Sequence, residues 1–228
     1  MQLPKFFAPL ALTLAAIPMA GHAQSGLSAE VEAMLAKAKG GDLHAQYRVG
    51  VAYDLGRGAP RDAVEAMKWY RSAAEAGYAD AQNSVGSVLQ EQGKHAEAFE
   101  WFEKSAAQEN ARALNNLAYF YEAGLGVAQD RQKSFELYSR SADLGWGEAM
   151  WNLSGIYGSG QLGEPDLVMA CAWTLRAGRF AGPKGAKLTA ATAERMTQLE
   201  PLLSAAQMQS CREQGEAWSP KASAASTP

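Results

Sequence analysis

Residues 45–58 read AQYRVGVAYDLGRG, and the pattern continues with Asp62, AMKWY at 66–70, AA at 73–74 and Gly77. The chain repeats this pattern about four times. The alanines that open the copies follow one another at intervals of 36, 32 and 36 residues: Ala45, Ala81, Ala113 and Ala149. Self-similarity at this period predicts a stacked array of helical hairpins.

Each copy is expected to form two helices. Ala45, Val49, Gly50 and Tyr53 share one face at 3.6 residues per turn, so they predict the packing stripe of a first helix. Glycines at 56 and 58 then end that helix, because glycine tolerates the positive φ common at helix C-termini. The second copy has a shorter turn between its helices, and its hairpin is therefore expected to be tighter.

The second helix of each hairpin is expected to begin at an acidic N-cap. Asp62 has this place in the first copy, and Asp130 and Asp166 have it in the third and fourth. The helix then presents Trp69 and Tyr70 to the core. Because these aromatic residues recur from copy to copy, the pattern assigns them to packing.

The whole signature resembles the Sel-one-like repeat family, which is related to the tetratricopeptide repeats. The resemblance rests on small opening residues, a tyrosine, Gly-x-Gly, an aspartate, Ala-x-x-Trp-Tyr, Ala-Ala and a final glycine, and it covers about residues 42–180. The sequence departs from the family pattern at Leu162, which replaces the second glycine of copy four. The resemblance implies an all-α, right-handed α-α solenoid that binds proteins as an adaptor. It implies no catalytic residues, since these repeats conserve packing positions.

The chain divides into an N-terminal targeting segment, a repeat array and the segments that cap the two ends of the array. Residues 1–23 combine Lys5, an apolar run and small residues before a cleavage site, which is typical of a secretory signal peptide. An uncleaved membrane anchor is the alternative, although the run is short for a span. We expect an N-terminal capping helix at 24–41, repeats at 42–78, 79–110, 111–146 and 147–182, C-terminal capping helices at 183–218 and a disordered tail at 219–228.

Export to the periplasm or the exterior would place the two cysteines in an oxidising compartment. Cys171 lies in the fourth copy and Cys211 in the last helix, which must pack nearby to cap the array. A disulfide between them is therefore expected. Two buried free thiols, each a small apolar side chain, are the alternative.

Composition and charge restrict the class of partner. Hydrophobic residues make up 47% of the 228 residues and charged residues 20%, which suits a folded core. The net charge of −3 gives no support for nucleic-acid binding. No segment after the signal is expected to insert into a membrane. His44 and His95 lie in different repeats without metal-ligand spacing, so no metal or cofactor is expected.

Recognition residues are expected where the first helices point away from their packing stripe. In solenoids of this family the first helices line the inner curve, and exposed aromatics and amides suit peptide binding. The predicted binding residues are Tyr47, Arg48, Asn115, Asn116, Tyr119, Trp151 and Asn152. For Tyr47 and Trp151, the alternative to a binding role is packing between repeats.

The leading hypothesis is an exported, non-catalytic scaffold that binds a protein or peptide on its concave helical face. The alternative is a cell-wall- or beta-lactam-related enzyme, or a ligand binder, built on the same repeats. Ser154 and its neighbouring glycines suggest a nucleophile turn, but the Gly-x-Ser-x-Gly sequence is absent and the repeat explains the glycines as turn residues. The sequence therefore favours the scaffold over the enzyme.

Overall fold

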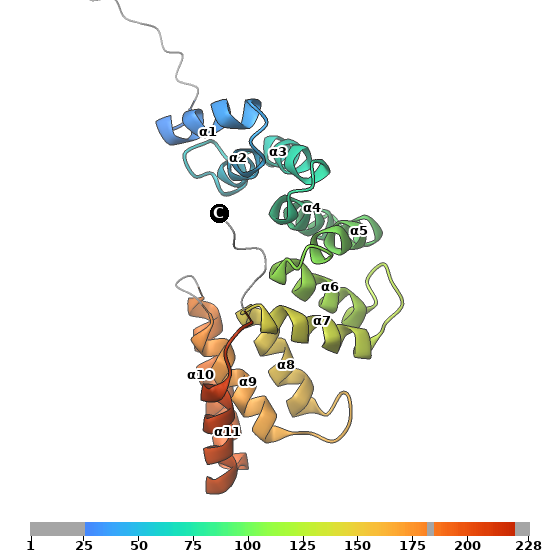
Figure 1. Cartoon of the computed structure of the whole chain (residues 1–228), viewed down its shortest axis with the longest axis vertical. Coiled ribbons are helices and arrows are strands. Elements are labelled where there is room, and N and C mark those ends of the chain that lie inside the picture. The colour runs from blue at the N-terminus through green and yellow to red at the C-terminus, as the bar shows by residue number, and fades with distance from the viewer. Residues whose placement is uncertain (1–25, 182–184, 222–228) are drawn as a thin grey trace, which may run out of the picture.

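A computed structural model describes residues 26–181 and 185–221 (Figure 1). The predicted signal peptide at 1–23 and the last residues of the tail, 222–228, lie outside this part. Within it the chain is helical and without strands: α1 Ala29–Lys39, α2 Leu43–Leu55, α3 Ala63–Glu75, α4 Ala79–Glu91, α5 His95–Ala106, α6 Ala111–Ala123, α7 Arg131–Asp143, α8 Gly147–Ser159, α9 Leu167–Arg179, α10 Ala186–Leu199, the 3₁₀ turn η1 Glu200–Leu202 and α11 Ala205–Ala217.

Consecutive helices pair as antiparallel hairpins, α2 with α3, α4 with α5, α6 with α7 and α8 with α9. Helix α1 packs on α2 at one end, and α10 and α11 both pack on α9 at the other. The described chain curves as an arc, with α2 and α4 on its inner side relative to α3 and α5 (Figure 1). The predicted all-α solenoid with capping helices at both ends is confirmed.

Side-chain caps explain where the helices begin. Asp62, Asp130 and Asp166 accept hydrogen bonds from backbone N–H groups in the first turns of α3, α7 and α9. Ser204 and Gln207 form a reciprocal capping box at the start of α11. The three aspartate caps are those that the sequence predicted, and each cap satisfies donors that a helix leaves unpaired at its N-terminus.

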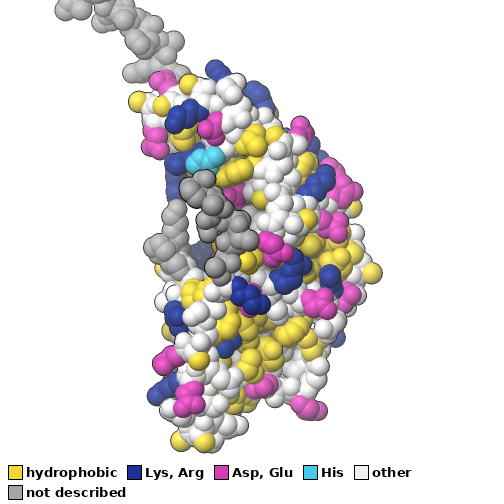
Figure 2. Space-filling view, viewed as in Figure 1, with side chains coloured by type: hydrophobic (Ala, Val, Ile, Leu, Met, Phe, Trp, Pro, Cys, Tyr) yellow, Lys and Arg dark blue, Asp and Glu magenta, His cyan; other side chains and the backbone are white. Residues whose placement is uncertain are grey.

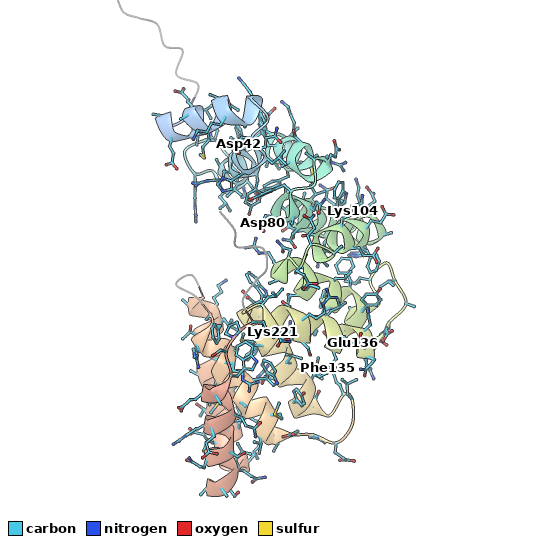
Figure 3. All side chains as sticks on the ribbon, viewed as in Figure 1. Asp42, Asp80, Lys104, Phe135, Glu136 and Lys221 are labelled. Carbon is cyan, nitrogen blue, oxygen red and sulfur yellow. A yellow bond between two sulfur atoms is a disulfide. The ribbon has the colours of Figure 1, made fainter. Side chains whose placement is uncertain are left out.

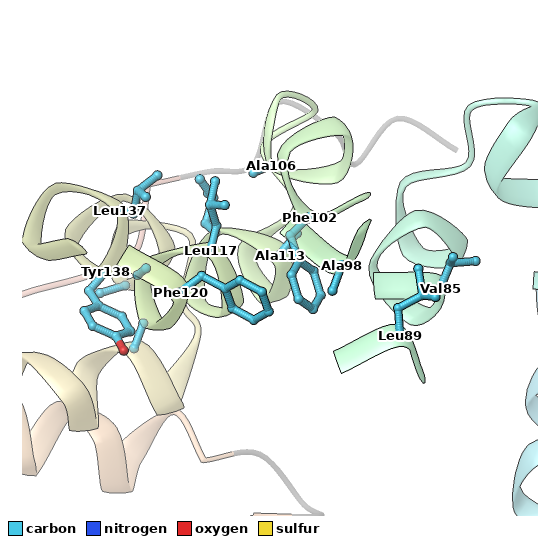
Figure 4. Close-up of a cluster of buried hydrophobic side chains, with 14 of the residues drawn as sticks. Val85, Leu89, Ala98, Phe102, Ala106, Ala113, Leu117, Phe120, Leu137 and Tyr138 are labelled. Atoms are coloured by element: carbon cyan, nitrogen blue, oxygen red, sulfur yellow. The ribbon is translucent and has the colours of Figure 1, made fainter. Parts of the chain in front are cut away.

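The packing stripe places a small residue against an aromatic ring. A Cβ atom at Gly50 would lie 2.6 Å from the Tyr70 ring, and one at Gly86 would lie 2.7 Å from the Phe102 ring. Glycine at this position therefore lets the first helix approach the second helix of its own hairpin. The buried side chains of successive hairpins form one cluster from Ala66 to Ala177 (Figure 4).

The C-terminal cap is held by covalent and aromatic contacts. Cys171 of α9 and Cys211 of α11 form a disulfide with their Cα atoms 5.7 Å apart. The Arg176 guanidinium lies 4.2 Å from the Trp173 ring centroid and 5.4 Å from that of Trp218, and donates a hydrogen bond to the Gln214 carbonyl. These contacts fix α11 against the fourth repeat.

Candidate functional site

Two hollows on the inner side of the first helices meet at Val51, and we call them together the inner groove. One hollow lies between α1 and α2 and has a volume of about 450 Å³. The other runs from α2 across α4 to Arg112 of α6, with a volume of about 440 Å³. Val51 lines both hollows, which together adjoin the first two repeats and reach Arg112 of the third.

The α1–α2 hollow contains the predicted residue Arg48. Its guanidinium pairs with Glu30 of α1 at 3.4 Å, and both side chains are exposed. An exposed pair of this kind contributes little to stability, since solvent screens it. Arg48 is therefore available to exchange Glu30 for a carboxylate on a bound partner.

The α2–α4 hollow combines apolar and polar walls. Val51, Leu55 and Val88 supply its apolar surface, and Ser84 and Ser87 supply hydroxyl groups. Leu55 is 51% exposed, which leaves it open to contact. Apolar walls with hydroxyl groups beside them suit an extended peptide that carries apolar side chains. The backbone of such a peptide also needs hydrogen-bond partners.

Charged side chains stand at the ends of this hollow. Within the described residues the Glu91 side chain makes no hydrogen bond or ion pair. Arg112 makes no ion pair there, although its guanidinium lies 5.1 Å from the Trp146 ring centroid. Arg61 instead donates to the Asp54 carbonyl oxygen at 3.0 Å. Glu91 and Arg112 thus give the hollow an acidic and a basic side chain that have no ion-pair partner among the described residues.

Tyr47 lines the α2–α4 hollow and also packs between repeats. Its ring centroid lies 5.9 Å from that of Tyr70 and 5.5 Å from that of Tyr78, at the entry to the second repeat. Tyr47 is half-buried as a result. The structure therefore gives this residue a packing contact together with a face toward the groove.

The predicted asparagines form two inter-repeat pairs, which we call the asparagine pairs. Asn116 of α6 donates its side-chain N–H to the Asn83 side-chain oxygen of α4 at 2.9 Å. Asn152 of α8 donates to Asn115 of α6 at 3.1 Å. Asn83 is 2% exposed. These amides therefore connect successive first helices, and Asn115, Asn116 and Asn152 remain half-buried at the inner surface.

The two aromatic residues predicted in the later repeats differ in exposure. Tyr119 is 45% exposed on α6. Trp151 is half-buried, and the Arg195 guanidinium of α10 lies 3.2 Å from its ring centroid and donates to its carbonyl oxygen at 3.0 Å. Burial lowers the pKa of Arg195. Trp151 is thus a contact point for the C-terminal cap, whereas Tyr119 is open to a partner.

Ser154, which the sequence raised as a nucleophile, is buried in a hydrogen-bond network. Its hydroxyl oxygen lies 2.6 Å from that of Thr174 and accepts a hydrogen bond from Arg195 at 3.1 Å. Neither of these two partners of Ser154 is a histidine or a carboxylate that could act as a base. The network joins α8, α9 and α10, which is a structural role.

Two buried tyrosines bond to carboxylates behind the groove. Tyr70 donates to Asp54 at 3.2 Å, and Tyr138 donates to Glu122 at 2.9 Å. Burial, followed by the negative charge of the neighbouring carboxylate, raises the pKa of both phenols far above the ordinary value. The folded protein therefore holds both phenols in the protonated form.

This arrangement predicts a loss of stability in alkali. An unfolded tyrosine ionises near pH 10, whereas the folded phenols keep their protons, so the folded state binds more protons above that pH. The free energy of unfolding is expected to be unaffected by these groups below about pH 9. Above pH 10 it should fall by about 1.4 kcal/mol per pH unit for each tyrosine. Urea unfolding between pH 9 and pH 11.5 should show a shallower fall for Y70F/Y138F than for the wild type, and equal slopes would contradict the assignment.

Residues 26–181 and 185–221 contain no group of three or more histidine, cysteine, aspartate or glutamate residues that could hold a metal ion. No helix among them is long and apolar enough to cross a membrane. Figure 2 shows acidic and basic side chains interspersed along the face in view.

Sequence reasoning missed most of the inner groove. Two of its candidate binding residues, Tyr47 and Arg48, line the groove, whereas the others lie in repeats three and four. The groove's apolar and hydroxyl walls, notably Val51, Ser84 and Val88, come from repeats one and two. A signal was present, since these residues lie at or near the outward-facing positions of the first helices, yet small or aliphatic side chains were not recognised as a site.

The fold and the groove define a helical-repeat scaffold of the solenoid class. A model of the Sel1 repeat matches residues 43–78, 79–110, 111–146 and 147–179. The chain belongs to the Sel1 repeat family, whose repeats serve in general as non-catalytic scaffolds for protein–protein interaction.

Several known proteins are similar to this chain. A protective antigen of uropathogenic Escherichia coli with an SLR fold matches with a TM-score of 0.71 and 28% identity, over 81% of this chain and 39% of that one. A Sel1 repeat protein from Oxalobacter formigenes has a TM-score of 0.59 and 29% identity, over 69% and 67%. Chitin synthase regulatory factor 3 of Schizosaccharomyces pombe is 31% identical over 136 residues, which cover 55% of this chain and 15% of that protein.

Proposed function

We propose that this protein is an exported, non-catalytic scaffold that binds an extended segment of another protein in the inner groove. The observation that carries the proposal is the groove itself: two hollows that meet at Val51 on the inner side of the first helices. Export is supported by the signal-like sequence at 1–23 and by the disulfide between Cys171 and Cys211.

The chemistry of the groove favours a peptide segment as the ligand. Val51 and Val88 would contact apolar side chains, and the hydroxyl groups of Ser84 and Ser87 lie where a peptide backbone could bond to them. Arg48 and Arg112 would pair with acidic groups of the ligand. This combination of an apolar centre with polar and charged edges is typical of protein–protein interfaces.

The test is a matched pair of substitutions that place the same arginine inside and outside the groove. Val88→Arg fills the α2–α4 hollow, whereas Val64→Arg alters a residue that is 79% exposed on α3. Peptides would be selected from a display library on the immobilised wild type and titrated by calorimetry against all three proteins. V88R is expected to weaken binding at least tenfold, about 1.4 kcal/mol, and V64R to leave it unchanged.

Two outcomes would contradict the proposal. Peptides that bind V88R as tightly as the wild type would exclude the inner groove as the site, provided that circular dichroism shows V88R folded. Hydrolysis of beta-lactams or peptidoglycan fragments by the purified protein would overturn the non-catalytic assignment. The export step is tested separately, by fractionation of cells that express the full chain.

A further inference from the structure

The first helix of the fourth repeat holds an arginine side chain from another part of the chain. Helix α10 packs on α8, and the Arg195 guanidinium lies 3.2 Å from the Trp151 ring centroid. The same guanidinium donates to the Trp151 carbonyl oxygen at 3.0 Å and to the Ser154 hydroxyl at 3.1 Å. It also lies 4.0 Å from the place that a Cβ atom would take at Gly155. This face of α8 therefore binds a guanidinium group through an aromatic ring and hydrogen bonds.

The corresponding face of the third repeat lies on α6. The opening alanines of the two copies align Tyr119 of α6 with Gly155 of α8. Asn152 of α8 bonds to Asn115 of α6, so the two faces adjoin each other. Tyr119 is 45% exposed, and an aromatic ring that is open to solvent can take a guanidinium on its face. The third repeat thus has an open aromatic ring at the position that adjoins Arg195 in the fourth.

A carboxylate lies one helical turn from the Tyr119 ring. Glu122 follows Tyr119 by three residues, and residues at this spacing are neighbours on a helix surface. The Tyr138 hydroxyl donates to one carboxylate oxygen of Glu122 at 2.9 Å, which orients the carboxylate. Burial, then the charge of Glu122 and last Tyr119 raise the pKa of Tyr138, so Tyr119 also stands near this pair. Within residues 26–181 and 185–221 Glu122 forms no ion pair and its second oxygen accepts no hydrogen bond, which leaves the carboxylate able to pair with a cation.

The third copy alone combines the ring and the carboxylate in its sequence. In the other copies the place of Tyr119 is taken by Val51, Ser87 and Gly155, and the place of Glu122 by Asp54, Gln90 and Gly158. Asp54 differs from Glu122 in its surroundings, because its hollow also contains Arg61 and Arg112. An arginine of a partner would meet like charges there. The third copy is therefore the place where the side chains favour a cation.

We propose that Tyr119 and Glu122 form a subsite for an arginine side chain of the protein partner. The guanidinium stacks on the Tyr119 ring and pairs with the Glu122 carboxylate, as Arg195 lies on the Trp151 ring in the adjoining repeat. Arginine suits the subsite better than lysine, because its planar group can both stack on a ring and donate two parallel hydrogen bonds to a carboxylate. This inference rests on the proposed function for the class of ligand, but its two residues lie outside the walls of the inner groove.

The test is a titration of the ¹⁵N-labelled full chain with N-acetyl-arginine amide, followed through the backbone amide resonances. The signals of residues 115–123 are expected to shift and to saturate at millimolar concentrations of the probe. N-acetyl-citrulline amide has the same shape without the charge, and it is expected to bind roughly tenfold more weakly because the charge-assisted hydrogen bonds are lost. N-acetyl-lysine amide keeps the charge without the planar group and should bind about threefold more weakly than the arginine probe.

Substitutions inside and outside the subsite assign the shifts. E122Q removes the charge but keeps an oxygen that can accept from Tyr138, and it should weaken binding of the arginine probe roughly tenfold. Y119L removes the ring and should weaken binding about threefold. The matched control is E136Q, because the Glu136 side chain is 52% exposed on α7, pairs with Lys133 and lies on the outer side of the arc (Figure 3). E136Q should bind the arginine probe as the wild type does.

Three results would overturn the proposal. The first is an affinity for the citrulline or lysine probe equal to that for the arginine probe. The second is equal binding of the arginine probe by E122Q and E136Q. The third is a set of shifts that lies outside residues 115–123. Failure of the proposed function is distinguishable, because the titration needs no display peptide: peptides retained by V88R would exclude the inner groove without bearing on the arginine subsite.

Discussion

Replacing Phe102 with alanine is expected to lower the free energy of unfolding by about 3–5 kcal/mol. The ring is fully buried. It packs against Gly86 within its own hairpin and edge-on against Phe120 of the next, with ring centroids 5.2 Å apart (Figure 4). Its removal would leave a cavity between the second and third repeats that the surrounding helices cannot fully close. Urea unfolding followed by circular dichroism measures the effect.

Phe135→Ala is the matched control for this prediction. Phe135 is half-buried on α7 and contacts Tyr157 with ring centroids 5.8 Å apart, so its removal exposes less buried surface. F135A is expected to lose clearly less stability than F102A. Each hairpin of a solenoid contacts only the hairpins next to it. The loss of stability in F102A should therefore arise at the interface of repeats two and three. Equal losses in F102A and F135A would contradict this account of the core.

Removing the disulfide is expected to have the next largest effect. The double variant C171A/C211A should lose about 3–4 kcal/mol, since the cross-link closes a loop of 40 residues and restricts the unfolded chain. Both sulfur atoms lie in a buried cluster with Leu199, so the alanines also remove some apolar contact. The measurement is urea unfolding with and without a reductant.

The wild type and the double variant control for each other. Reduction should destabilise the wild type toward the value of C171A/C211A and leave that variant unchanged. A thiol assay on the unfolded, unreduced wild type should find no free cysteine. A wild type that is equally stable with and without reductant would show that the cross-link does not hold α11 on α9.

The sequence was sufficient for the features that depend on local rules. Repetition of the pattern at a fixed interval identified the hairpins, and the aspartates and glycines located helix ends because caps and turns depend on a few adjacent residues. The Asp62 cap of α3 is one example. Gly50 is another, since the packing stripe placed it at a helix–helix contact.

The inner groove was less predictable from the sequence because it depends on how helices that are far apart in the sequence are placed in space. Val51 lines two hollows only because α1 and α4 flank α2, and no rule of spacing within one helix gives that arrangement. The contact between Arg195 and Trp151 joins residues 44 apart and requires α10 to fold back across α8. The asparagine pairs likewise depend on the offset between neighbouring first helices.

The asparagine pairs also restrain sliding between neighbouring first helices. Each pair joins two first helices at one amide-to-amide distance, 2.9 Å for Asn83 with Asn116 and 3.1 Å for Asn115 with Asn152. A sliding shift of one helix along the next would break the bond. At Asn83, which is 2% exposed, this would leave a buried amide unsatisfied, which costs about 1–3 kcal/mol. The interval between contact points along the inner curve is therefore preset. A ligand that spanned α4, α6 and α8 would therefore meet contact points at a fixed interval.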